Sequence, residues 1–346
     1  MLHRDGKYPG ISFVGTDKVL VYETETTGQL STRGDPEISS EFRLHLSVLD
    51  AQAGALELTR DWNTHLHSAQ VLATAGGVLV KTGGILRLYS QDFEEARELR
   101  ISQDPSGNFF VSTSASGRTI AICQYQTRAK GYRYSSHVEV FDADNLKLKF
   151  SWDQFPPIFR MSLSDTSFVM THTGVVNVEK FGGHEGRSLT SQSSHDCGRR
   201  ATILSDESIL LQDCDAIRLI SSTGSSHTLE SFDDRGSRVL RDPKCKPYNP
   251  TITPTSVSVA SGGSRFVAVS LPTVETETQL LQESRQCLSA FNLTVYDLAL
   301  KRQISSINID PAPEKDFDFA LSPDGSRLAV LNDQTVSVYA LTAGPL

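Results

Sequence analysis

The stretch Asp316–Leu341, DFDFALSPDGSRLAVLNDQTVSVYAL, decides how the chain folds. It contains three short apolar runs, which are Phe317–Leu321, Arg327–Leu331 and Val336–Leu341. Alternating apolar residues, rich in β-branched and aromatic side chains, predict a β-strand for each run. The Pro-Asp-Gly group between the first two runs is typical of a tight turn, because proline presets φ and glycine tolerates positive φ. The stretch therefore predicts an antiparallel meander of three strands.

Looser copies of this meander recur along the chain, and each is anchored on a tight turn between its first two strands. The seven turns are Thr16-Asp17, Gly76-Gly77, Ser116-Gly117, Asp165-Thr166, Asp206-Glu207, Gly262-Gly263 and Asp324-Gly325. A third and a fourth strand follow each of the first six. Repeated four-stranded units of about 40–50 residues are typical of a β-propeller. The sequence therefore predicts an all-β fold, a seven-bladed β-propeller of four-stranded antiparallel blades.

We expect this propeller to form one domain over residues 1–346. Two stacked β-sandwich domains are the alternative, and they would require a boundary near the middle of the chain. The region Phe159–Phe181 instead continues the same rhythm. The seventh unit ends at Leu341 without a fourth strand. Because an open ring would leave a sheet edge unpaired, we expect Leu2–Tyr8 to be the available donor.

Several repeats resemble a known family. The segment LSPDGSRLAV (321–330) resembles the first hairpin of WD-repeat and related bacterial propeller blades. The third-strand endings VLD (48–50), VFD (140–142) and VYD (295–297) resemble the same family. The repeated Gly-His opening and Trp-Asp ending of true WD repeats are absent. The resemblance implies the propeller fold, and it implies no particular activity because the family is functionally diverse.

The composition bears on the class of partner. The 346 residues carry a formal net charge of −8, and the isoelectric point is about 5.6. Nucleic-acid-binding proteins usually show a basic patch, so no nucleic-acid partner is expected. No apolar run approaches the roughly 20 residues of a membrane helix, so no membrane span is expected. The opening residues Met1–Gly6 lack the apolar core of a signal peptide.

Strand order assigns the connections of each blade to two ends. The turns between first and second strands, and between third and fourth strands, are short and share one end. The long connections belong to the other end, and they are Thr24–Glu41, Thr127–Ser136, Asp233–Thr255 and Pro272–Cys287. Long loops in a compact domain are usually functional or disordered. This loop-rich face is the predicted binding surface, and the alternative is that the loops plug and cap the channel mouth.

One of these loops is basic and carries two tyrosines. It could clasp an anionic or sugar-like group, and the candidate ligand residues are Arg128, Lys130, Tyr132, Arg133 and Tyr134. The alternative is that these charges are paired or solvated, as surface charges usually are.

Two histidines, His65 and His67, flank Leu66 in the connection to the second unit. They could bind a ligand or ligate one ion together. No carboxylate or thiol stands at a recognisable metal-ligand spacing, so neither a metal nor a cofactor is predicted.

Four of the five cysteines fall on the loop-rich face as two same-blade pairs. We predict the disulfides Cys197–Cys214 and Cys245–Cys287, which would pin these loops and imply export to an oxidising compartment. Four free thiols and a cytoplasmic protein are the alternative. Cys123 lies inside a strand and is expected to be an inert core residue.

These observations predict a non-enzymatic binding or interaction module that presents its loop-rich face to a protein or a small polar ligand. A propeller hydrolase or lyase with a site at the channel mouth is the alternative, since carboxylates fall near such positions, at Asp153, Asp196, Asp310 and Asp316. No G-x-S-x-G turn is present, and no helix follows the Gly-Gly pairs to form a phosphate cradle. A histidine and carboxylates converging in a pocket would favour the enzyme.

Overall fold

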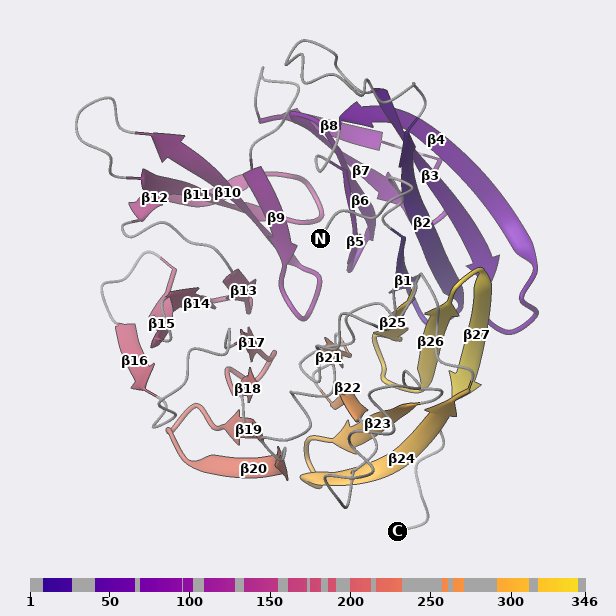
Figure 1. Cartoon of the computed structure of the whole chain (residues 1–346). Helices are drawn as coiled ribbons and strands as arrows, with labels where there is room; N and C mark the ends of the chain where they lie inside the picture. The colour runs from indigo at the N-terminus through magenta and orange to yellow at the C-terminus, as the bar shows by residue number, and fades with distance from the viewer. Residues whose placement is uncertain are drawn as a thin grey trace, which may run out of the picture. The chain divides into compact units, whose positions relative to one another are not determined.

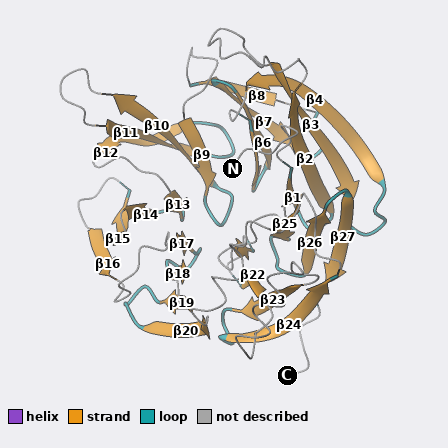
Figure 2. Cartoon of the chain, viewed as in Figure 1, coloured by secondary structure: helices purple, strands orange, loops and turns teal. Residues whose placement is uncertain are grey.

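The computed structural model describes residues 9–26, 41–65, 69–94, 96–101, 109–127, 134–154, 161–172, 175–181, 186–190, 200–212, 216–231, 257–260, 264–270, 291–310 and 317–341. These residues form 27 strands and no helix (Figure 2). The chain divides into two compact units, Met1–Ile158 and Phe159–Leu346. Each unit is a series of antiparallel meanders in chain order.

The first unit contains blades 1 to 3, which have four strands each (Figure 1). Blade 1 comprises β1 (Gly10–Val14), β2 (Lys18–Thr26), β3 (Glu41–Asp50) and β4 (Leu56–His65). Blade 2 comprises β5 (Gln70–Thr74), β6 (Gly77–Thr82), β7 (Ile85–Ser90) and β8 (Ala96–Arg100). Blade 3 comprises β9 (Phe109–Thr113), β10 (Thr119–Thr127), β11 (Tyr134–Asp142) and β12 (Leu148–Gln154).

The second unit contains blades 4 to 7. Blade 4 comprises β13 (Met161–Leu163), β14 (Ser167–His172), β15 (Val175–Lys180) and β16 (Gly186–Thr190). Blade 5 comprises β17 (Arg200–Ile203), β18 (Ile209–Gln212), β19 (Ala216–Ile220) and β20 (Ser226–Ser231). Blade 6 comprises β21 (Val257–Val259), β22 (Arg265–Ser270), β23 (Phe291–Asp297) and β24 (Arg302–Ile309). Blade 7 has three described strands, β25 (Phe317–Leu321), β26 (Arg327–Asn332) and β27 (Thr335–Ala340).

This series of seven consecutive sheets confirms the predicted seven-bladed β-propeller fold. The fourth strand that was expected from Leu2–Tyr8 lies outside the described residues. The single-domain organisation over residues 1–346 stays a prediction.

Apolar residues from consecutive blades share each part of the core. Blades 1 and 2 share a cluster around Leu20 and Val78, and blades 2 and 3 share one around Leu79 and Ile120. In the second unit, similar clusters join blades 4 and 5, blades 5 and 6, and blades 6 and 7. Alternate residues of a strand point to opposite faces, so a blade with a neighbour on each side within its unit, such as blade 2, buries both faces. We call the contact between two consecutive blades a seam.

The turn between the first two strands has the chemistry expected from Pro-Asp-Gly. In blade 7, Gly325 has a φ of +71° and donates its N–H to the carbonyl of Ser322. Gly117 repeats this geometry in blade 3 with a φ of +72° and a bond to Ser114. Glycine is favoured at both positions because L side chains rarely adopt positive φ.

Candidate functional site

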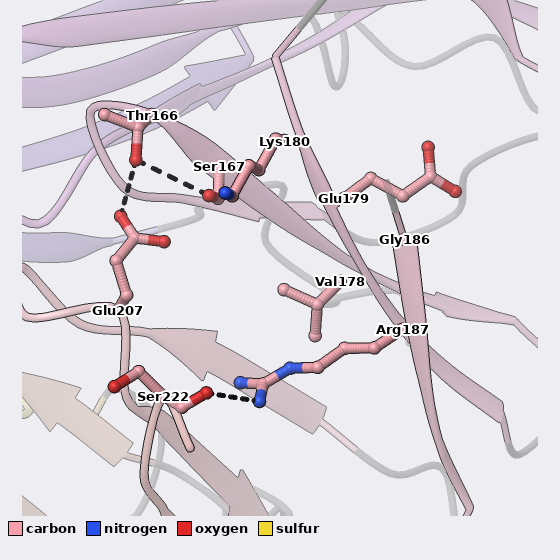
Figure 3. A pocket seen from close by; sticks show the side chains of 9 residues that line it. All are labelled: Thr166, Ser167, Val178, Glu179, Lys180, Gly186, Arg187, Glu207 and Ser222. Atoms are coloured by element: carbon pink, nitrogen blue, oxygen red, sulfur yellow. Dashed lines mark hydrogen bonds between the residues drawn. The ribbon is translucent and has the colours of Figure 1, made fainter. Parts of the chain in front are cut away.

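A pocket of about 550 Å³ lies at the seam between blades 4 and 5 (Figure 3). It opens at the end of the blades that carries the short turns, which we call the turn end. Its lining residues are Thr166, Ser167, Val178, Glu179, Lys180, Gly186, Arg187, Glu207 and Ser222. All belong to the second unit, and none was singled out as a ligand residue from the sequence.

The blade 4 wall of this pocket is set by strand register. Ser167 pairs with Lys180 across β14 and β15, and Glu179 pairs with Gly186 across β15 and β16. Val178 pairs with Arg187 one step further along. Val178 is buried, and it contributes the apolar side chain of a wall that otherwise consists of charged and polar side chains and Gly186.

The blade 5 wall is formed by two turns. Glu207 lies in the β17–β18 turn, where its Oε1 accepts bonds from the hydroxyls of Ser164, at 2.5 Å, and Thr166, at 2.8 Å. Both donors belong to the β13–β14 turn of blade 4. The other carboxylate oxygen of Glu207 points toward Val178 (Figure 3). Glu207 therefore links the two blades through one oxygen and presents the second oxygen to the pocket.

Arg187 also links the same two blades. Its Nη1 donates to the carbonyl oxygen of Ser222, in the β19–β20 turn, at 2.7 Å (Figure 3). This bond uses one of the five N–H donors of a guanidinium. The side chain is thus anchored while the rest of its charged group lies beside the pocket.

The backbone of Glu207 is strained. Its φ is +64°, in the left-handed region that costs an L side chain about 1–2 kcal/mol. Gly117 stands at the same turn position in blade 3, since each residue donates its N–H to the carbonyl three residues earlier. A side chain is therefore held at a position where blade 3 has none.

The seam between blades 2 and 3 shows what this difference does. There the carbonyl of Gly117 accepts directly from the N–H of Ala75 at 2.9 Å. A Cβ atom added to Gly117 would lie 2.5 Å from that nitrogen. The two turns meet backbone to backbone at this seam, whereas at the seam between blades 4 and 5 the Glu207 side chain stands between them.

Blade 4 also departs from the other blades at the end of its third strand. In the other blades an apolar or aromatic residue there is followed by Asp, Ser or Ala, as in Leu49-Asp50, Tyr89-Ser90, Phe141-Asp142, Tyr296-Asp297 and Tyr339-Ala340, and in Ile220-Ser221, where Ser221 directly follows the strand. Blade 4 has Glu179-Lys180 instead. Burial raises the pKa of the Glu179 carboxyl, and this carboxylate points away from Glu207 (Figure 3).

In several other blades, the side chain at the second of these positions accepts hydrogen bonds from backbone N–H groups of the turn that follows it in the same blade. Asp50 accepts from the N–H groups of Gln52 and Ala53, Asp142 accepts from Asp144, and Ser221 accepts from Ser225. Lysine has no acceptor, so Lys180 cannot make such a cap. It instead adds an ammonium group to the pocket lining. This break in a repeated ending is the sequence signal by which the site could have been found.

Few of the residues that were singled out from the sequence belong to the part of the chain that the structure describes. Arg128, Lys130, Tyr132, Arg133 and His67 lie outside the described residues. Two placements were wrong: Tyr134 begins β11 and His65 ends β4, so neither lies in a loop. Both strands extend further than predicted because their ladders continue to Thr127–Tyr134 and Glu41–His65.

Among the cysteines, Cys123 is fully buried and free in β10, as expected, and burial raises its thiol pKa to about 11. The residues of both proposed disulfides, Cys197, Cys214, Cys245 and Cys287, lie outside the described part of the chain. Of the four candidate channel-mouth carboxylates, Asp153 lies in β12 and Asp310 is exposed after β24, while Asp196 and Asp316 are not described.

A different constellation lies on blade 1. His45 Nδ1 is 2.7 Å from Asp61 Oδ1, and His45 Nε2 is 3.3 Å from Ser47 Oγ. The His–Asp pair recurs in blade 3, where His137 Nδ1 is 2.8 Å from Asp153 Oδ1. In both blades the histidine and the aspartate are direct partners across the third and fourth strands.

Within the described residues, no group of three or more His, Cys, Asp or Glu side chains is arranged to hold a metal ion. A search of the same residues for a helix able to cross a membrane finds none.

Comparison with known proteins identifies the fold and no family. No family model and no curated protein matches the sequence. Three similar solved structures are "Crystal Structure of Mitotic Checkpoint Complex" (13% identity, TM-score 0.53, 98% of this chain and 91% of that chain), "Kuenenia stuttgartiensis Hydrazine Synthase" (12%, 0.54, 98% and 96%) and "KlHsv2 with loop 6CD replaced by a Gly-Ser linker" (11%, 0.51, 97% and 94%). Identities this low show the fold alone, and that fold is a WD40-like β-propeller.

Proposed function

We propose that the protein is a non-enzymatic binding module, and that the pocket at the seam between blades 4 and 5 receives a segment of a protein partner. The pocket carries this proposal because two of its features depart from the equivalent positions of other blades. Glu207 stands at a glycine position, and Glu179-Lys180 replaces an apolar–Asp/Ser ending. Local rules are broken in this way mainly at functional sites, where the cost is offset by a selected role.

A protein partner is supported by the character of the pocket and of a similar protein. The lining combines a buried valine with acidic and basic side chains on two blades, and recognition sites of this kind fix orientation with a few polar groups around an apolar wall. The mitotic checkpoint structure is, by its title, a chain within a protein complex. A propeller that engages another protein is the corresponding role for this chain.

The test is peptide selection with a matched pair of variants. Full-length protein is immobilised and used to select from a displayed library of random 12-residue peptides. Ser222→Trp fills the pocket mouth while the backbone carbonyl bonded by Arg187 remains. Asp144→Trp is the control, because Asp144 offers the equivalent carbonyl to Arg97 at the seam between blades 2 and 3.

We expect the same peptides to be enriched on wild type and Asp144→Trp and to be lost on Ser222→Trp. Enrichment of identical peptides on all three proteins contradicts the proposal, and so does a selection that enriches no peptide on wild type.

The loop-rich face stays a second proposed surface. Its candidate ligand residues are Arg128, Lys130, Tyr132 and Arg133, with Tyr134 at the start of β11 beside them in the sequence. Its test is a native pull-down with and without the loop Asp233–Thr255. Unchanged partners would remove that loop from the binding surface.

Hydrolysis is a second candidate function, favoured by the Ser47–His45–Asp61 geometry. Two observations weigh against it. The strand β3 pairs with both β2 and β4, so its ladders use the backbone N–H groups from which an oxyanion hole would be built. In blade 3 the counterpart of Ser47 is Glu139, so the His–Asp pair recurs without a nucleophile. Hydrolysis of p-nitrophenyl acetate that is lost in Ser47→Ala would establish the enzyme.

A further inference from the structure

We infer that the pocket at the seam between blades 4 and 5 takes the carboxylate of an acidic residue in an extended segment of the partner, whose neighbouring N–H group binds Glu207. This inference rests on the proposed function and adds the chemistry of the ligand. It comes from the charges on the two walls of the pocket and from the bonds that already hold them.

The blade 4 wall carries two cations, Lys180 and Arg187, and one carboxylate, Glu179, which points away from Glu207 (Figure 3). Lys180 and Arg187 come from adjacent strands, β15 and β16, and both line the pocket beside Val178. Arg187 is partly buried, and its bond to the Ser222 carbonyl fixes it while leaving further donors of its planar group for a ligand. A guanidinium recognises a carboxylate with two parallel donors, and such charge-assisted bonds are about twice as strong as neutral ones.

The blade 5 wall is anionic, and its carboxylate can accept a hydrogen bond from a donor group of the ligand. Glu207 is partly buried, and the hydroxyls of Ser164 and Thr166 both bind its Oε1. The oxygen that points toward Val178 is a pure acceptor (Figure 3). A ligand that satisfies both walls must therefore accept hydrogen bonds on one side and donate one on the other.

These requirements select between classes of ligand. A phosphate group would satisfy the blade 4 wall, but its second negative charge would face Glu207 and it offers no N–H donor. A lysine or arginine side chain would face two cations on blade 4. An aspartate or glutamate within an extended peptide has both parts, since its carboxylate meets Arg187, its methylene groups lie on Val178, and a backbone N–H reaches Glu207.

A comparison of this seam with the seam between blades 2 and 3 supports a ligand role for the two walls of the pocket. Arg97 has the position of Arg187 in blade 2, where it pairs with Leu88 as Arg187 pairs with Val178. It also donates to a turn carbonyl of the next blade, that of Asp144, at 2.6 Å. At that seam, however, the position of Lys180 is held by Ser90 and that of Glu207 by Gly117. The arginine link is common to both seams, and of these two seams the one between blades 4 and 5 adds the charges of Lys180 and Glu207.

Isothermal titration calorimetry with the full-length protein tests the ligand class. The probes are the blocked pentapeptides acetyl-Gly-Ser-Asp-Ser-Gly-amide and its asparagine counterpart, with free aspartate as a third probe. We expect the aspartate peptide to bind about 10-fold more tightly than the asparagine peptide, as the loss of one charge-assisted bond implies. Arg187→Gln should weaken it by about the same factor, whereas the matched control Arg97→Gln should leave its affinity unchanged.

Each remaining outcome separates this inference from the proposed function. Equal affinity for the two pentapeptides contradicts recognition of an acidic residue. If Ser222→Trp still abolishes peptide selection in that case, the proposed binding module is retained. Equal binding of free aspartate overturns the peptide and leaves a small-molecule site. A peptide affinity that neither Arg187→Gln nor Ser222→Trp reduces places binding elsewhere and overturns both proposals.

Discussion

Lys81 is the most unusual single residue of the core. It lies in the middle of β6 with 3% of its surface exposed. Its Nζ donates to the carbonyl oxygen of Phe109 at 2.5 Å and lies 4.3 Å from the centroid of the Phe109 ring. These contacts join blade 2 to blade 3. Burial nevertheless lowers the pKa of Lys81 to about 8, because the ammonium form loses its hydration.

This lowered pKa predicts that stability increases with pH. Between pH 8 and 10.5 the unfolded chain holds a proton on Lys81 that the folded protein has released, so the free energy of unfolding rises over this window. The gain is on the order of 3 kcal/mol at most. Urea unfolding of wild type and Lys81→Met from pH 7 to 10.5 measures this gain. We expect the free energy of unfolding of wild type, minus that of Lys81→Met, to increase with pH.

The comparison with Lys81→Met isolates this effect from that of Cys123. Burial raises the pKa of Cys123 to about 11, so its contribution is full below pH 9 and is lost as the pH rises through 11. Both proteins contain Cys123, and its contribution cancels in their difference. Parallel pH curves for the two proteins would contradict the role assigned to Lys81.

The remaining cysteines give a second prediction for single residues. If Cys197–Cys214 and Cys245–Cys287 are disulfides, alkylation of the unfolded, unreduced protein should label one thiol, that of Cys123. Reduction beforehand should raise the number of labelled thiols to five, the cysteine content of the chain. Mass spectrometry reads both numbers, and five labels without reduction would exclude both disulfides and remove the argument for export.

At the scale of elements, two seams share the same arginine link. Arg97 Nη1 donates to Asp144 O at 2.6 Å and Arg187 Nη1 donates to Ser222 O at 2.7 Å. Each bond joins the fourth strand of one blade to a turn of the next. We expect Arg97→Met and Arg187→Met each to lower the free energy of unfolding by about 0.5–1.5 kcal/mol, since methionine keeps an aliphatic stem and loses the bond.

The two links share no partner, so their effects should add to within about 0.5 kcal/mol in the double variant. Chemical denaturation of the four proteins measures this. A coupling of more than about 1 kcal/mol would show that the two seams do not act independently.

The existence of each strand was more predictable from the sequence than the residue at which it begins, and the reason is physical. The strand–turn–strand unit of Asp316–Leu341 was read correctly because alternation and turn residues are local signals. Strand starts were less predictable. In the fourth strand of blade 3, the apolar alternation already begins at Leu146, but Leu146 has a φ of +56° in the turn and the strand begins at Leu148. A bulge at Val140/Phe141 shifts the ladder there, and alternation does not reveal an extra residue.

The candidate site could be predicted only in part. The turn Asp206-Glu207 and the ending Glu179-Lys180 are visible as departures from the repeat. Their convergence is not, because it depends on which side chains of one blade meet the turns of the next. The bonds from Ser164 and Thr166 to Glu207 cross the seam between residues about 40 positions apart, and no local pattern specifies such a pairing.

At the scale of the whole molecule, the repeated seams determine how the chain should unfold. A single blade cannot bury both of its faces, and stability in such repeats comes largely from contacts between neighbours. The apolar clusters join blades 1 to 3 within Met1–Ile158 and blades 4 to 7 within Phe159–Leu346. Each unit should therefore unfold as a whole.

The predicted single domain over residues 1–346 further requires the two units to unfold together. We then expect differential scanning calorimetry of the full chain to show one transition, with a calorimetric enthalpy of about 240 kcal/mol near 60 °C, at roughly 0.7 kcal/mol per residue. The van't Hoff enthalpy should equal the calorimetric value, because one cooperative unit takes up all of the heat. If the units are independent domains, the scan should instead resolve into two transitions, or give a van't Hoff enthalpy near half of the calorimetric value, and the single-domain prediction would be wrong.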